Sequence, residues 1–150
     1  SFSGLTVGSV GTAIYDTSTN TWSAGPNVPS VGGVPYTLAD APAAVLPNGN
    51  ILFAASPGNW TANNNTHFPN PTHYFEMNIA DNTMLQVADK SDFATFNSYE
   101  HNLLVLPTGQ IMDFTIDGPT VQIYTPTGSA SAAWMPSVIP VPTTQVPGPS

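Results

Sequence analysis

The chain has 150 residues, of which a single one is Lys or Arg and nine are acidic, giving a formal net charge of −8. Charged residues make up 7% of the chain, where about 25% is typical of soluble domains. Nucleic-acid binding and a polybasic membrane anchor are excluded, because both need clusters of Lys and Arg.

The absence of Cys removes disulfides, thiolate metal sites and Cys nucleophiles. No apolar run approaches the roughly 20 residues of a membrane span. The first residues lack an initiator Met and a basic segment, which predicts an internal or processed end. Ser, Thr and Asn carry the polarity in place of Lys and Glu, which favours an extracellular or cell-surface protein.

Short β-branched and aromatic runs between turn residues predict an all-β fold. After an N-terminal segment, residues 1–11, a first hairpin is expected, with strands at 12–16 and 21–23 around a polar turn. Further hairpins of this kind pair 73–77 with 83–87, and 120–124 with 133–135.

A second kind of hairpin alternates with the first and repeats almost unchanged. Residues 43–54 return sixty positions later as residues 103–114, with Val, Leu, Pro, Gly and Ile in matching places. Each copy reads as a strand, a three-residue turn and a strand. Pro47 and Pro107 suit the second position of a type I turn, and Gly49 and Gly109 suit the left-handed position after it. Both glycines are therefore expected to have positive φ.

The order of hairpins predicts half a repeat followed by two full four-stranded repeats, as in the blades of a β-propeller. The expected units are the outer half of a blade at 12–35, a second blade at 36–90 and a third blade at 91–138. A Pro-rich linker or tail follows at 139–150.

Residues 15–22, with the pattern Tyr-Asp-x-x-Thr-Asn-x-Trp, resemble the second half of a kelch repeat. Residues 98–110 and 121–126 resemble a late blade of the galactose-oxidase-like kelch propellers. The resemblance covers roughly residues 10 to 140 and implies a partial propeller of about two and a half blades ahead of a C-terminal β-sandwich domain. Since complete propellers of this type have about six or seven blades, the remainder of the propeller or another subunit is expected to cover the terminal blade faces.

In that family a Tyr-His pair before an inner strand ligates copper. The resemblance places Tyr99 on the ligand Tyr but Glu100 on the ligand His, with His101 one position later. One residue along a strand reverses the side-chain direction, and the Cys that crosslinks to a Tyr in that family has no counterpart here. The alternative interpretation is that Tyr99 packs at the blade edge and His101 is hydrogen-bonded nearby.

Two further sets of residues are candidates for binding. Asp40 and Glu100 are sixty positions apart, so they occupy equivalent places near one end of the predicted channel. Carboxylates there can bind Ca²⁺ or accept hydrogen bonds from sugar hydroxyls. Alternatively, each accepts hydrogen bonds from loop backbone N–H groups. The loop 56–72 holds Asn59, Trp60 and His67, which suit a sugar platform or a cover for the blade. Asn59 and Asn64 begin glycosylation sequons.

Three functions follow from these patterns. The first is a non-catalytic extracellular propeller module for glycan or protein binding or scaffolding, without a cofactor. The second is a fragment of a copper radical oxidase. The third is a structural subunit of an extracellular assembly.

Overall fold

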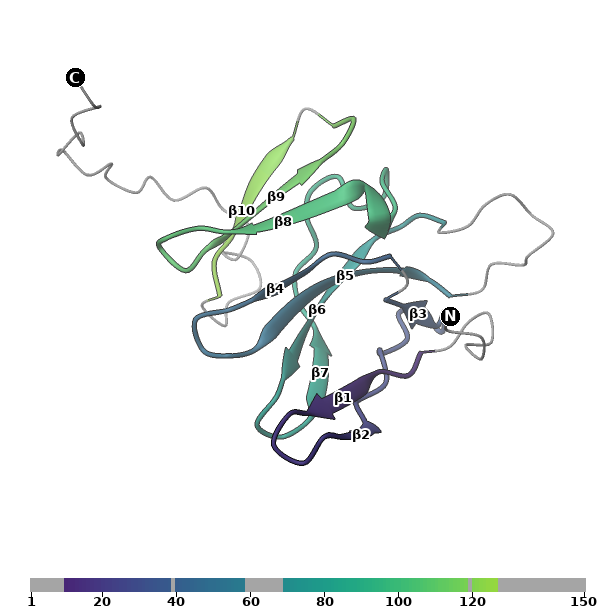
Figure 1. The fold of residues 1–150 in the computed structure, drawn as a ribbon. Helices are drawn as coiled ribbons and strands as arrows, with labels where there is room; N and C mark the ends of the chain where they lie inside the picture. The colour runs from purple at the N-terminus through teal and green to yellow at the C-terminus, as the bar shows by residue number, and fades with distance from the viewer. Residues whose placement is uncertain (1–9, 39, 59–68, 119, 127–150) are drawn as a thin grey trace, which may run out of the picture.

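The computed structural model describes residues 10–38, 40–58, 69–118 and 120–126. This part of the chain is all-β, and its sheets follow one another in chain order, as Figure 1 shows. Apart from the strands it contains one 3₁₀ turn, Ser98–Glu100. In the same residues there is no helix of the length and hydrophobicity that crossing a membrane requires.

The first sheet is a two-stranded hairpin of β1 (Ala13–Asp16) and β2 (Thr21–Ala24). The antiparallel register places Tyr15 opposite Trp22. The turn between the strands ends at Asn20, whose φ of 58° lies in the left-handed region that Asn tolerates. This hairpin is the one expected from residues 12–23.

The middle sheet is an antiparallel meander of β4 (Ala43–Val45), β5 (Ile51–Pro57), β6 (His73–Asn78) and β7 (Thr83–Gln86). The far end of β5 also pairs with the short strand β3 (Tyr36–Thr37). The four-stranded order therefore agrees with the hairpin pattern of the sequence.

The last sheet holds β8 (His101–Val105), β9 (Ile111–Thr115) and β10 (Val121–Tyr124), in the order β10-β9-β8. The strands β4 and β8 contact each other across the two sheets. The predicted fourth strand at 133–135 and the tail at 139–150 lie outside the described residues.

The two repeated hairpins have the same turn geometry. The N–H of Gly49 donates to the carbonyl of Leu46 at 2.9 Å, and the N–H of Gly109 donates to Leu106 at 2.9 Å. The φ values of Gly49 and Gly109 are 86° and 82°. The predicted positive φ at both positions is confirmed, which explains why both turns end in glycine.

The middle sheet is apolar on both faces and has a separate core on each. On one face Leu52, Ala54 and Tyr74 pack against Ile111 and Tyr124 of the last sheet. The opposite face packs against the segment that follows the first hairpin, with Ile14 of β1 at its margin. The buried members of this second core are Val28, Tyr36, Ala55, Phe75, Met77 and Met84.

The outer face of the last sheet is largely apolar as well, with Asn102 as a polar side chain opposite Phe114. The register places Leu104 beside Met112 and Ile123, and Phe114 beside Val121, on the face opposite to Ile111. Leu104 and Val121 are 51% and 58% exposed. The sequence predicts that the remainder of the propeller or another subunit covers the terminal blade faces. In the described structure the chain itself covers one face of the last sheet, and its outer face stays exposed.

Substitution of the two turn glycines separates backbone strain from packing. An added Cβ at Gly49 meets no atom within 4 Å, whereas at Gly109 it overlaps the Pro47 ring of the neighbouring turn. Gly49→Ala should lower the free energy of unfolding by about 1–2 kcal/mol through strain alone. Gly109→Ala should lower the free energy of unfolding by the same amount and by about 1–3 kcal/mol more, because the added Cβ overpacks the contact with Pro47.

Denaturant unfolding measures both free energies. Equal decreases in the free energy of unfolding of the two variants would contradict the contact between the turns.

Candidate functional site

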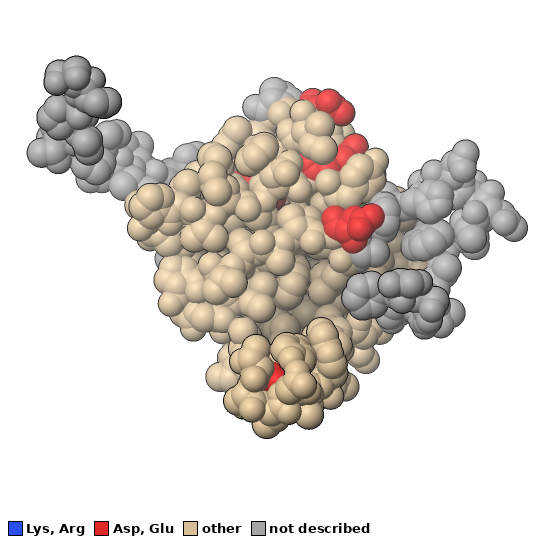
Figure 2. All heavy atoms as spheres, in the orientation of Figure 1, with Lys and Arg blue, Asp and Glu red and all other residues tan. Residues whose placement is uncertain are grey.

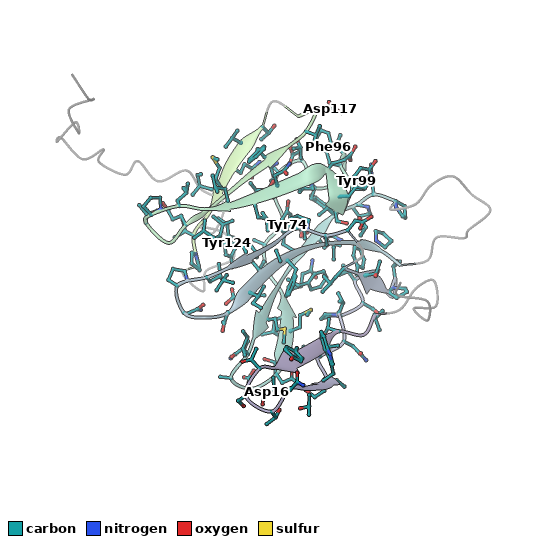
Figure 3. All side chains as sticks on the ribbon, viewed as in Figure 1. Asp16, Tyr74, Phe96, Tyr99, Asp117 and Tyr124 are labelled. Atoms are coloured by element: carbon teal, nitrogen blue, oxygen red, sulfur yellow. The ribbon has the colours of Figure 1, made fainter. Side chains whose placement is uncertain are left out.

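A buried polar cluster lies between the middle and the last sheet, where Figure 3 shows Tyr74. It consists of Tyr74 on β6, Lys90 after β7, His101 on β8 and Asp113 on β9, and each of these residues is at most 2% exposed. The core residues Ala54, Leu52 and Ile111 lie in the same interface. Buried polar groups of this kind are stable only with mutual hydrogen bonds.

Asp113 is the centre of the cluster. The Tyr74 hydroxyl donates to its Oδ2 at 2.5 Å, and the Lys90 ammonium lies 3.3 Å from its Oδ1. His101 Nδ1 lies 3.0 Å from Oδ1 and 2.9 Å from the Tyr74 hydroxyl. Three donors from three different segments therefore converge on one carboxylate.

A second carboxylate lies beside the same ammonium. Asp92 Oδ1 is 3.5 Å from Lys90 Nζ, and the Asp92 side chain is largely buried. Both of its oxygens are inaccessible to solvent and lack a hydrogen-bond partner, as does Nε2 of His101. The cluster is thus incompletely satisfied, which is uncommon for groups buried this deeply.

Burial raises the pKa of Tyr74 well above its ordinary value, and the Asp113 carboxylate adds to this effect. The neutral phenol is therefore held as a donor. Because Lys90 is fully buried and is the single Lys or Arg of the chain, no Lys or Arg side chain reaches the surface. Figure 2 accordingly shows acidic and uncharged side chains on the face it presents.

A hydrogen-bonded pair of His73 and Asp89 borders the cluster. His73 Nδ1 lies 2.7 Å from Asp89 Oδ2, and the His73 ring stacks on Phe93 with centroids 5.3 Å apart. Burial raises the pKa of Asp89, while His73 acts in the opposite direction. Asp89 also accepts the backbone N–H of Tyr74. This pair therefore holds the start of β6.

The predicted site around residues 99–101 is divided between surface and interior. Tyr99 is 47% exposed, whereas His101 is buried in the polar cluster. Glu100 accepts the N–H of Asn97 at 2.9 Å and closes the 3₁₀ turn. His101 has the hydrogen-bonded environment of the alternative interpretation, and Glu100 has a local backbone role.

Of the remaining candidate residues, one is exposed and the others lie outside the described residues. Asp40 is exposed in the loop before β4, with a φ of 47°. The candidates Asn59, Trp60, Asn64 and His67 lie outside the described residues. Among the residues that the structure describes, no three His, Asp or Glu side chains are grouped as a metal site would require.

A surface pocket of about 270 Å³ lies between the two repeated turns. Its lining includes Pro47, Asn48, Thr108, Gln110 and Pro126. The volume is just below the range of about 300–1,000 Å³ that is usual for small-molecule sites. The buried cluster is therefore the stronger candidate for chemistry.

No protein-family model matches the sequence, and no curated protein matches it.

Sequence reasoning missed Tyr74, Lys90, Asp92 and Asp113 as members of one site. Their contacts span between 23 and 39 positions along the chain, apart from the neighbouring Lys90 and Asp92. One signal was available, since a single Lys in 150 residues is unusual. That signal marked the residue but not its partners.

Lys90→Met tests the ion pair. The change should lower the free energy of unfolding by about 3–5 kcal/mol, because it leaves the buried Asp113 carboxylate without its cation. Asp16→Asn on the first hairpin is the matched surface control and should have little effect. Denaturant unfolding measures both variants, and equal stability of Lys90→Met and the parent chain would contradict the pairing.

Alkaline pH should destabilise the fold. Burial raises the pKa of Tyr36 to about 12 and also raises those of Tyr74 and Tyr124. Above pH ~10 the unfolded chain loses phenolic protons that the folded chain retains, so the free energy of unfolding falls as pH rises. Tm measured from about pH 9 to about pH 11.5, a range that brackets the ordinary phenolic pKa of about 10, reports the slope.

Tyr74→Phe should make this slope shallower. Phe75→Leu, which removes apolar volume and no ionisable group, should lower Tm and leave the slope unchanged. An unchanged slope in Tyr74→Phe would contradict the role of the buried phenol.

Proposed function

We propose that the chain is a non-catalytic section of a kelch-type propeller, which further blades complete by packing on its two terminal faces. The observation that supports this most is the apolar outer face of the last sheet. The last sheet already packs on the middle sheet through its other face. A further apolar face on the same sheet favours continued stacking of sheets.

The last sheet ends in a surface suited to a further sheet. Five of its outward side chains, Leu104, Met112, Phe114, Val121 and Ile123, are apolar, and Asn102 opposite Phe114 is polar. Burial of such area stabilises by about 25 cal/mol per Å². A contiguous apolar face is rare on a monomer and typical of an interface.

The first hairpin has a comparable outer face. Tyr15 and Trp22 lie on the side opposite to Ile14, with ring centroids 5.0 Å apart, and Trp22 is 70% exposed. The hairpin has two strands, where the middle sheet has a four-stranded meander. A complete blade would add strands beside it and a neighbour over the aromatic pair.

The setting we propose is extracellular, and the module binds a glycan or a protein through loops at the ends of the sheets. The abundance of Ser, Thr and Asn in place of Lys and Arg supports this setting. A copper radical oxidase is favoured less, since Glu100 stands at the position of the ligand His and accepts a local backbone N–H. A structural subunit of a larger assembly would use the same two terminal faces.

Expression of residues 1–150 alone tests the stacking. We expect defined oligomers or aggregation by light scattering, because the outer apolar faces find no partner. Leu104→Thr with Val121→Thr should reduce this association. Leu85→Thr is the matched control, because Leu85 is 68% exposed but lies on β7, away from the outer face of the last sheet.

A parent chain that is a stable, soluble and cooperatively unfolding monomer would contradict the proposal. The mass of the native particle from its source then separates a section of one long polypeptide from a separate subunit.

A further inference from the structure

The environment of Lys90 brings together an amine and a carboxyl group in a dry interior. Lys90 Nζ lies 3.3 Å from Asp113 Oδ1, and both side chains have no exposed surface. Separate charges are costly in such surroundings. Lys is also the residue that becomes a nucleophile when it is desolvated, and fixed proximity strongly accelerates reaction between two groups.

Asp92 supplies a second acid at the same amine. Its Oδ1 lies 3.5 Å from Nζ, and neither of its buried oxygens has a hydrogen-bond partner. A carboxyl group in this position can take a proton from the amine and return it to a leaving oxygen.

The two oxygens of Asp113 are held by further donors. The Tyr74 hydroxyl donates to Oδ2, and His101 Nδ1 lies within hydrogen-bond distance of Oδ1. Donors on a carboxyl group withdraw electron density from its carbon and stabilise the charge that develops on oxygen during attack. The cluster thus contains a nucleophile, a polarised carboxyl group and a proton carrier.

We infer that Lys90 and Asp113 form an intramolecular isopeptide bond. The nitrogen of Lys90 bonds to the Asp113 side-chain carbon and gives up two of its three protons, the carbon loses one oxygen, and Asp92 relays these two protons to that oxygen, which leaves as water. An ammonium and a carboxylate become one amide and one water, so no oxidant, reductant or co-reactant is needed. The product replaces two buried charges by a neutral amide.

The bond would join the segment after β7 to β9, across the interface between the middle and the last sheet. A chain without Cys has no disulfide to stabilise it outside the cell. A covalent link between residues 23 positions apart would stabilise the fold chiefly by restricting the unfolded chain. This inference rests on the cluster itself and does not depend on the propeller proposal.

Trypsin offers a direct test, because Lys90 is its single cleavage site in the whole chain. The full chain, denatured and treated with trypsin, should remain one species, since an acylated lysine is not cleaved. Its intact mass should be lower than the sequence mass by one water. Cleavage into residues 1–90 and 91–150, with the full sequence mass before digestion, would overturn the inference.

Two controls make the result specific. Succinimide formation at Asp117-Gly118 also removes one water but leaves Lys90 cleavable, so a lowered mass with normal cleavage overturns the inference as well. Asp92→Asn should restore cleavage, whereas Asp89→Asn, which alters the neighbouring hydrogen-bonded pair, should not. Complete bond formation in Asp92→Asn would overturn the proton transfer assigned to Asp92.

Discussion

A thin sheet with apolar side chains on both faces cannot be stable by itself, and the described structure depends on this constraint. Leu52 and Tyr74 on one face of the middle sheet, and Phe75 and Met77 on the other, require two separate covering layers. The chain supplies these layers from the segments before and after the sheet. Because the layer that follows the middle sheet is itself a sheet with a largely apolar outer face, that outer face needs a cover in turn.

The interface between the middle and last sheets combines this apolar packing with one polar centre. Asp113 is surrounded by Tyr74, Lys90 and His101, which come from the middle sheet, the connecting segment and the last sheet. Apolar side chains tolerate small slips of one sheet over another, whereas converging hydrogen bonds do not. The polar centre therefore defines the relative position of two sheets that hydrophobic burial alone would leave less specific.

Burial of Lys90 limits how the surface of this chain can contact other molecules. Since Lys90 is buried, the surface has carboxylates, hydroxyls, amides and apolar groups but no Lys or Arg side chain. Contacts with other molecules must therefore come from hydrogen bonding and apolar burial instead of attraction to anions. This chemistry agrees with glycan or protein contacts and with stacking of sheets.

The sequence by itself determined the all-β class, the left-handed glycines at 49 and 109, and the hairpins at 13–24, 43–57, 73–86 and 101–115. Those features depend on residues adjacent in the chain, where Pro and Gly restrict the backbone directly. Only the tertiary structure decided that Lys90, Asp92 and Asp113 meet, and that His101 points into the interior while Tyr99 is exposed. Such contacts depend on how one sheet is placed on another, and no local pattern encodes that placement.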